Sequence, residues 1–383
     1  MKIAIHTLIG HFNYGCILQT YALQTTLESL GHSVKIINRR EEKPVKRVLL
    51  KRFLGVIRDF FRRYVLKNGT VFIRNPYDAT YSFGYIDFSL LKKFAQKNLK
   101  YTKINRSSSS LNRYIRNNKF DAYVVGSDQV WREEYVPEIL DSFLGYLPTD
   151  DKAIKISYAA SFGTSELPIS KEKLPYCIEL AKKFNGISVR EKSGVGLVSE
   201  YFGLDAVNVL DPTFLLDATD YKEFIKDNSF GCNKVVSYIL DNTEEKKKIV
   251  RMASTTLNVD SLNLMDYPLN KEGRQRLYSV EDWLAAISNA EFVVTDSFHG
   301  CVFSIIFNKP FIVVANKGRG IERFLSILQL LGLEERLIFS CSEAESKLDV
   351  CIKTPKTENV MSKLKVEKEK SMDFLQRYLK LQH

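Results

Sequence analysis

Residues 292–314 read FVVTDSFHGCVFSIIFNKPFIVV, and this stretch decides the fold of the chain. An apolar run of β type, Phe292–Val294, gives way to a short polar loop at residues 295–300. A compact apolar run of helix length follows at Cys301–Phe307, and after a polar stop a second β-type run closes the stretch. Strand, loop, helix and strand in this order predict a βαβ unit.

The loop of this unit is the first candidate site. In such a unit the loop lies at the carboxyl edge of a parallel sheet, where ligands bind, and the following helix points unpaired backbone N–H groups at it. His299 lies in this loop, and an imidazole titrates near neutral pH. His299 is therefore a candidate acid or base, with a packed or helix-capping histidine as the structural alternative.

Length and composition indicate a globular protein. The chain has 383 residues, of which 45% are hydrophobic and 26% are charged, so it is long enough for two domains. No apolar run approaches the roughly 20 residues of a membrane span, and the start, MKIAIHT, lacks a signal-peptide core. The six cysteines contain no CxxC pair, which argues against a zinc site and a disulfide framework. We expect a cytoplasmic protein without a metal site.

The net charge of +11 is concentrated in residues 39–68, where eleven Lys and Arg residues face three acidic ones. Apolar residues recur there at helical spacing between the basic ones, which predicts a basic amphipathic helix. Such a helix can lie on an anionic membrane surface, so we expect peripheral contact with the inner face of the membrane. A solvated helix covering one domain edge is the alternative. Nucleic-acid binders spread basic residues over a whole face, so none is expected as a partner.

The rest of the chain alternates between strand-like and helix-like runs. A strand ending in Asp211-Pro212 before a change of pattern looks like a linker, and the alternation starts afresh near Asn233. We predict an α/β protein with two Rossmann-like domains facing a cleft. Residues 1–213 form the first domain, with 39–68 as an insertion, and residues 214–383 form the second, with loop 295–300 and a charged terminal helix.

Polar residues at other strand ends supply further candidates. Asn13, Tyr14 and Gly15 follow the first strand at the start of a helix, without the GxGxxG pattern of NAD or FAD sites. Asp128 follows a strand and either accepts hydrogen bonds from sugar hydroxyls or caps a turn. Arg190 ends another strand, where a guanidinium can hold a carboxylate or phosphate at two points; the alternative is a structural pair with a neighbouring acid.

Six motifs carry a resemblance to a known family: NYGCILQTYAL (13–23), GHSVKIINRR (31–40), GSDQVW (126–131), SVRE (188–191), LDPTFLL (210–216) and TDSFHG (295–300). In this order, they make the chain resemble the polysaccharide pyruvyl transferase family over nearly its full length. The resemblance implies a GT-B-like fold. It also implies transfer of pyruvate from phosphoenolpyruvate to two hydroxyls of a sugar, as a ketal, in a capsular, exopolysaccharide or cell-wall polymer precursor. Phosphoenolpyruvate is then a co-substrate with no further cofactor, and the acceptor is a sugar or a lipid-linked oligosaccharide.

The family's loop histidine matches His299 and its upstream arginine matches Arg190. Many members carry an arginine two residues before the histidine, where this chain has Ser297, so another cation is expected to replace it. We expect His299 and Asp128 to be catalytic. The expected donor-binding residues are Arg190, Ser297, Gly300, Lys317, Arg319 and Arg323, and the expected acceptor-binding residues are Asn13, Tyr14, Gly15 and Ser127.

Two other functions remain open at this point. A GT-B-type nucleotide-sugar glycosyltransferase would place a nucleotide diphosphate at the helix that begins near Gly300. A non-catalytic sugar-binding relative would have lost its donor site through the change at Ser297.

Overall fold

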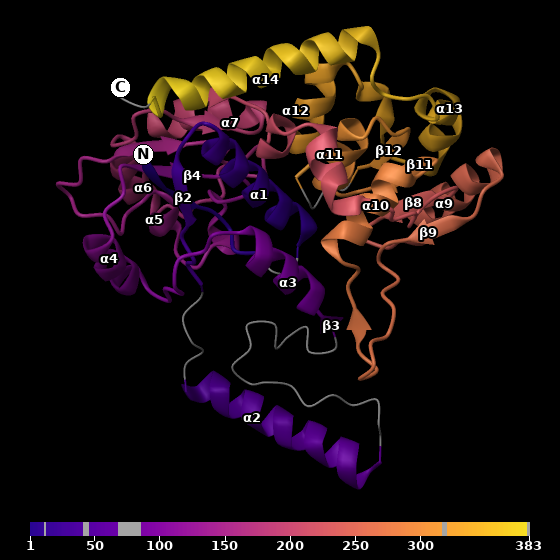
Figure 1. The fold of residues 1–383 in the computed structure, drawn as a ribbon, viewed down its shortest axis with the longest axis horizontal. Coiled ribbons are helices and arrows are strands. Elements are labelled where there is room, and N and C mark those ends of the chain that lie inside the picture. Colours follow the sequence, from indigo (N-terminus) through magenta and orange to yellow (C-terminus); the bar gives the residue numbers. More distant parts are fainter. Residues whose placement is uncertain (11–12, 41–45, 68–85, 316–319, 381–383) are drawn as a thin grey trace.

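The computed structural model describes residues 1–10, 13–40, 46–67, 86–315 and 320–380. Two parallel β-sheets lie in two halves of the molecule, each covered by helices, as Figure 1 shows. The short buried runs of the sequence form the strands, because parallel strands are covered on both faces.

The first sheet has the order β2-β1-β4-β5, and every pair in it is parallel. A smaller parallel pair, β6-β7, continues it through isolated bridges from Ile156 to Gly186 and from Ala160 to Val189. The strands are β1 (Lys2–His6), β2 (Ser33–Ile36), β4 (Ala122–Val125), β5 (Ile154–Ser157), β6 (Ser188–Val189) and β7 (Val207–Asn208).

The helices of this half are α1 (Tyr14–Ser29), α3 (Ser89–Asn98), α4 (Ser108–Asn117), α5 (Ile139–Ser142), α6 (Leu174–Ala181) and α7 (Lys192–Leu197). Capping side chains determine where two of these helices begin. Asn13 caps α1 by accepting a hydrogen bond from the backbone N–H of Cys16, and Ser107 forms a capping box with Ser110 at α4.

The second sheet has the order β13-β12-β11-β8-β9, again entirely parallel. Its strands are β8 (Val235–Tyr238), β9 (Ser261–Asn263), β11 (Phe292–Thr295), β12 (Phe311–Val314) and β13 (Leu337–Ile338), and its helices are α9 (Glu244–Leu257), α10 (Val280–Asn289), α11 (Phe298–Ile306), α12 (Glu322–Leu331) and α13 (Cys341–Cys351). In each sheet the strand order reverses beside the first strand, between β1 and β4 and between β8 and β11. Ligands bind at such switch points.

The two halves are joined by a buried 3₁₀ helix at Pro212–Leu215, which packs on α1, and by α8 (Ala218–Lys222). The last helix, α14 (Glu358–Tyr378), runs back across both halves in Figure 1. Its Ser371 Oγ accepts a hydrogen bond from the N–H of Leu210 at 3.0 Å. One hydrophobic core includes residues of both sheets and of α14. The division at residue 213 stays a prediction.

One helix, α2 (Lys46–Phe60), lies apart from both sheets in Figure 1. The chain returns to the body at β3 (Ile86–Asp87), which pairs with β10 (Gln275–Arg276). Among the described residues, no helix is both long enough and apolar enough to cross a bilayer.

Candidate functional site

The loops that follow β4, β6, β7 and β11 come together where the two halves meet, and each supplies one polar side chain. The first half supplies Asp128, Arg190 and Asp211, and the second half supplies His299. Asp128, Arg190 and His299 are predicted from the sequence as site residues, and Asp211 is not.

Arg190 is at the centre of the set and is only 5% exposed. Its Nη1 donates a hydrogen bond to Asp211 Oδ2 at 2.9 Å, and its Nη2 donates to Asp128 Oδ1 at 3.4 Å. Its Nε lies 4.0 Å from Glu191 Oε2. Burial lowers the pKa of Arg190, but these three carboxylates outweigh it and raise the pKa above its ordinary value.

His299 lies in the first turn of α11, which begins at Phe298 and not at Cys301 as the sequence suggests. Its Nε2 lies 3.7 Å from Asp211 Oδ2, an ion-pair distance that is too long for a hydrogen bond. The other side of the ring lies against Gly15 of α1, where an added Cβ would come 2.0 Å from Nδ1. Gly15, one of the expected acceptor residues, therefore makes room for the imidazole.

Asp211 contacts groups from both halves of the site, so the position expected to be a linker also carries a buried site residue. Asp211 is 2% exposed, and its Oδ1 accepts hydrogen bonds from the backbone N–H and the hydroxyl of Thr213. Burial raises the pKa of the Asp211 carboxyl, but His299 and Arg190 outweigh it and lower the pKa overall. An Asp that follows a short strand-like run was the sequence signal that could have identified Asp211. That strand, β7, pairs with β6, which precedes Arg190. Acids are seldom buried unless they are paired.

A second guanidinium, that of Arg323, lies near the Phe298 ring. The Cζ atoms of Arg190 and Arg323 lie 4.6 Å and 5.4 Å from the centre of that ring. Burial and the positive charge of Arg190 lower the pKa of Arg323 to about 10. A buried and a half-buried cation that repel each other favour an anion beside them.

Arg323 is thus one of the three expected replacements for the cation missing at Ser297. The other two, Lys317 and Arg319, lie outside the described residues. Ser297 itself is at the N-cap of α11 and makes no side-chain capping bond. Gly300 lets α11 pack on β11, since an added Cβ would come 2.3 Å from Thr295 Oγ1.

Three buried polar atoms of the site make no hydrogen bond with a described residue. His299 Nε2, Arg190 Nε and Glu191 Oε2 are buried without a hydrogen-bond partner among the described residues. Such atoms are rare in folded proteins, and a bound ligand or water often supplies the partner. Within the described ranges, no group of three or more His, Cys, Asp or Glu residues is placed to hold a metal ion.

Glu191 holds the loop on the first-half side of the site. Its Oε1 accepts hydrogen bonds from Ser161 Oγ and from the N–H groups of Phe162 and Gly163, at 2.8 to 3.0 Å. Gly163 in turn approaches Gly320 of the second half so closely that a Cβ at Gly320 would come 2.0 Å from the Gly163 carbonyl oxygen. Arg190 does pair with acids, as the structural alternative has it, and its nearest partner is Asp211 and not Glu191. The role of Arg190 toward a donor stays a prediction.

The remaining acceptor candidates have contacts within the protein. Asn13 caps α1, and the Tyr14 hydroxyl donates to the Tyr278 carbonyl while its ring stacks on Trp283 at 5.3 Å. The Ser127 hydroxyl is fully buried and lies 3.3 Å from Asp211 Oδ2. Their roles toward an acceptor stay predictions, as do the catalytic roles of His299 and Asp128.

The residues that form this site lie within a stretch that a family model matches. The model describes polysaccharide pyruvyl transferases and covers residues 13–318. The chain belongs to the polysaccharide pyruvyl transferase family. The protein is therefore a transferase. A search of curated protein sequences gives no match.

Solved structures share the fold of this family member at low sequence identity. A putative UDP-N-acetylglucosamine 2-epimerase from Listeria monocytogenes is 10% identical, with a TM-score of 0.52 over 100% of this chain and 98% of its own. A UDP-GlcNAc-bound epimerase from Neisseria meningitidis is 10% identical, with a TM-score of 0.48 over 96% and 99%. Spinosyn forosaminyltransferase is 10% identical, with a TM-score of 0.43 over 97% and 94%. The match to the Listeria structure, together with the two parallel sheets, makes this a GT-B-type fold with Rossmann-like halves.

Proposed function

We propose that the protein transfers pyruvate from phosphoenolpyruvate to two hydroxyls of a sugar in a polysaccharide precursor, forming a cyclic ketal and releasing phosphate. The observation that carries this proposal is the convergence of Arg190, Arg323 and His299 from the two halves around Phe298 and Asp211. The donor brings a carboxylate and a phosphate, so its binding needs several cations in one place.

The described residues do not supply all of this charge. Two guanidiniums face the carboxylates of Asp128, Asp211 and Glu191, so a multiply charged donor needs further positive charge. A protonated His299 adds one cation. Lys317 and Arg319, which directly precede Gly320 in the sequence, are the other candidates.

The chemistry begins with a proton delivered to the methylene carbon of the donor, which becomes the methyl group. His299 is the proposed acid, because its Nε2 is unbonded and Asp211 stabilises the imidazolium. One sugar hydroxyl then adds to the central carbon and loses its proton, with Asp128 as the proposed base or orienting group. Phosphate leaves, and the second hydroxyl closes the ring with loss of its proton.

The test of the acid role is His299→Ala. Positioned acids and bases typically contribute about 10²–10⁴-fold, so phosphate release from phosphoenolpyruvate with a sugar acceptor should fall by at least about 10²-fold. Thermal unfolding should show that the variant stays folded. Retention of more than about a tenth of the wild-type rate would exclude an essential acid or base role.

The donor itself is tested by ligand-induced thermal stabilisation. Phosphoenolpyruvate should raise the unfolding temperature of the wild type, and Arg323→Ala should reduce that shift. Stabilisation by UDP- or CMP-sugars instead would favour the nucleotide-sugar glycosyltransferase. Binding without phosphate release across candidate acceptors would favour a non-catalytic sugar-binding relative.

The cytoplasmic location and the choice among capsule, exopolysaccharide and cell-wall polymer belong to the same proposal. They are supported by the family alone. The polymer is identified by mass spectrometry of surface polysaccharides from cells with and without the gene.

A further inference from the structure

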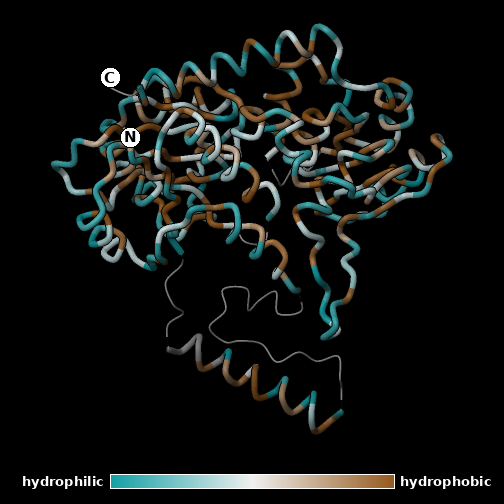
Figure 2. The backbone as a smooth tube through the Cα atoms, viewed as in Figure 1, coloured by the Kyte–Doolittle hydropathy of each residue, from teal (hydrophilic) through white to brown (hydrophobic). Residues whose placement is uncertain are grey.

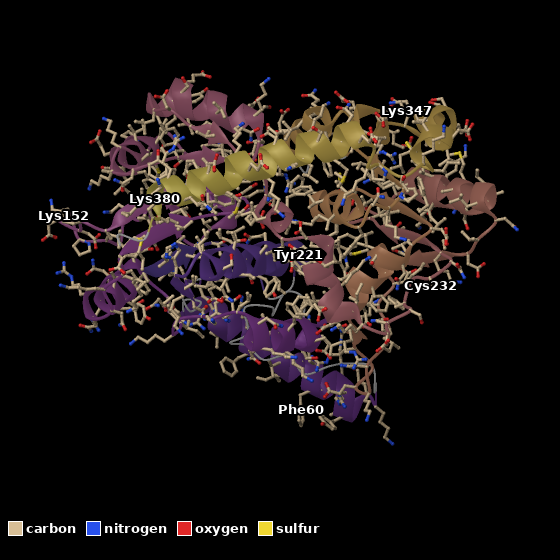
Figure 3. The ribbon with its side chains drawn as sticks, turned by 45° about the horizontal axis from the view of Figure 1, so that its top comes forward. Phe60, Lys152, Tyr221, Cys232, Lys347 and Lys380 are labelled. Atoms are coloured by element: carbon tan, nitrogen blue, oxygen red, sulfur yellow. The ribbon has the colours of Figure 1, made fainter. Side chains whose placement is uncertain are left out.

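The helix α2 carries an apolar stripe that the rest of the described chain leaves uncovered. Its side chains recur three and four residues apart, the spacing of one helix face. Each of them is between 41% and 64% exposed: Leu50, Phe53, Leu54, Ile57 and Phe60 in α2, and Phe61 and Tyr64 in the π-helical turn at Phe61–Val65 that continues it. Figure 2 shows the apolar residues recurring along this isolated helix, and Figure 3 places Phe60 at the outer edge of the molecule. We refer to these seven residues as the α2 stripe.

The side of the helix opposite the α2 stripe is the covered one. Asp59 is 1% exposed, whereas Ile57, two positions earlier and therefore across the helix, is 64% exposed. A helix that docked on its own protein would bury its apolar residues and expose its acid. In α2 the acid is buried and the apolar residues are exposed, so no described part of the chain covers the stripe.

Basic residues lie beside the stripe. Helical spacing puts Arg58 next to Leu54 and Phe61 along one border, with Arg62 one turn further along the same border. Arg58 is 59% exposed at its side chain, and its recorded ion pair is the long contact of 3.8 Å to Asp59. An apolar face bordered by cations matches the interface of an anionic bilayer, where acyl chains take the apolar residues and lipid phosphates take the arginines.

We propose that α2 is an interfacial helix that binds the protein to an anionic lipid surface through the α2 stripe. A second copy of the chain is a poorer occupant. Two such helices packed stripe to stripe would bring their arginine borders together, and like charges at the flanks of a helix pair repel. This inference does not depend on the donor or acceptor of the enzyme, because α2 contributes no residue to the site described above.

Co-sedimentation with vesicles tests the proposal on the full chain. The wild type should bind vesicles that contain phosphatidylglycerol and should not bind vesicles of phosphatidylcholine alone. Replacing both Ile57→Ser and Phe61→Ser should weaken binding by about tenfold or more, because two large apolar side chains no longer enter the bilayer. The matched control is Val366→Ser on α14, which is 57% exposed and should bind like the wild type.

The charge contribution is tested separately with Arg58→Gln and Arg62→Gln. Each basic residue near an anionic surface contributes about fivefold in binding, so the pair should lose about 25-fold. The same change at two exposed lysines elsewhere, Lys152→Gln and Lys365→Gln, should leave binding unchanged. Phosphate release in the absence of vesicles should be unaffected in all these variants.

Several outcomes would overturn the proposal. One is a wild type that fails to bind anionic vesicles. Another is a stripe variant that binds as tightly as the wild type. Light scattering is the third measurement, because a dimer that dissociates on Ile57→Ser and Phe61→Ser would show that a second copy covers the stripe. A loss of activity together with lower thermal stability in these variants would show that α2 is part of the folded core, which also contradicts the proposal.

Discussion

At the scale of single residues, the centre of the site is one carboxylate shared by two cationic groups. Asp211 Oδ2 lies 2.9 Å from Arg190 Nη1 and 3.7 Å from His299 Nε2. The guanidinium comes from the first half and the imidazole from the second. Asp211 therefore sets the relative position of the two groups, although in our proposal it does not touch the donor.

We expect Asp211→Asn to separate positioning from chemistry. The amide keeps the shape but removes the charge that pairs with Arg190, and breaking one partner of a buried ion pair costs about 3–5 kcal/mol. The free energy of unfolding should fall by that order, measured by urea titration. If the variant remains folded and active with an unchanged KM and kcat, Asp211 does not position the catalytic groups.

His6 provides a pH-dependent prediction outside the site. This buried imidazole stacks on Tyr146, and burial lowers its pKa from 6.5 to about 4. The folded state therefore binds the proton less well than the unfolded state. Stability is fully present above pH 6.5 and is lost as the pH falls toward 4, at up to about 1.4 kcal/mol per pH unit.

The measurement is the urea midpoint at several pH values in wild type and His6→Asn, which cannot take up the proton. The wild type should lose more stability than the variant between pH 6.5 and about 4. Parallel curves for the two proteins would show that His6 does not titrate in this window.

Sequence reasoning succeeds for residues whose position after a strand is itself informative. Arg190 and His299 are found this way, and both lie at the meeting of the two halves. Asp211 is missed because an Asp-Pro pair resembles a linker, and Phe298 is missed because the contact of one ring with two guanidiniums depends on tertiary packing. Spacing along one chain does not reveal such contacts across halves.

At the scale of elements, helices α1 and α11 approach each other at Gly15. The glycine is required because an added Cβ would come 2.0 Å from the His299 ring nitrogen, Nδ1. Gly15, in the first turn of α1, thus fixes the side chain of His299, in the first turn of α11.

We expect Gly15→Ala to displace the imidazole and reduce turnover by about tenfold or more, because small misplacements of a catalytic group are costly. Gly196→Ala is the matched control, since Gly196 lies inside helix α7 with no atom within 4 Å of an added Cβ. The control should keep full activity. Equal activity in both variants would show that Gly15 does not constrain His299.

Most elements follow from sequence periodicity. The βαβ unit predicted from residues 292–314 is present as β11, α11 and β12, and β12 covers Phe311–Val314. A capping box of Ser279 and Asp282 starts α10 just before it. The two-residue strands β3 and β10 are not predicted, because such short runs carry no period. The start of α11 is misplaced by its polar first turn, which resembles a loop.

At the scale of the whole molecule, the two halves share one hydrophobic core. It contains Ile3 and Leu27 from the first half, Trp283 and Phe303 from the second, and Phe374 from α14. Tyr14 of α1 stacks on Trp283 across the boundary. We therefore expect the halves to unfold together and not in sequence.

Phe374→Ala tests this coupling. Removing a buried phenyl ring costs about 3–5 kcal/mol, and Phe374 is 5% exposed. The chain's two tryptophans, Trp131 in the first half and Trp283 in the second, report on each half separately once the other is replaced by phenylalanine. Both should show the same lowered urea midpoint. A shift at only one tryptophan would mean that the halves unfold independently.

The path of α14 also restricts how substrates enter. Arg190 and His299 are nearly sealed from solvent. We therefore expect the close contact between Gly163 and Gly320 to open before a donor reaches them. We expect that opening to be a pivot about α14, because α14 contacts α12 in one half and accepts a hydrogen bond from Leu210 in the other. A change in the stiffness of the C-terminal helix should then change the rate of turnover.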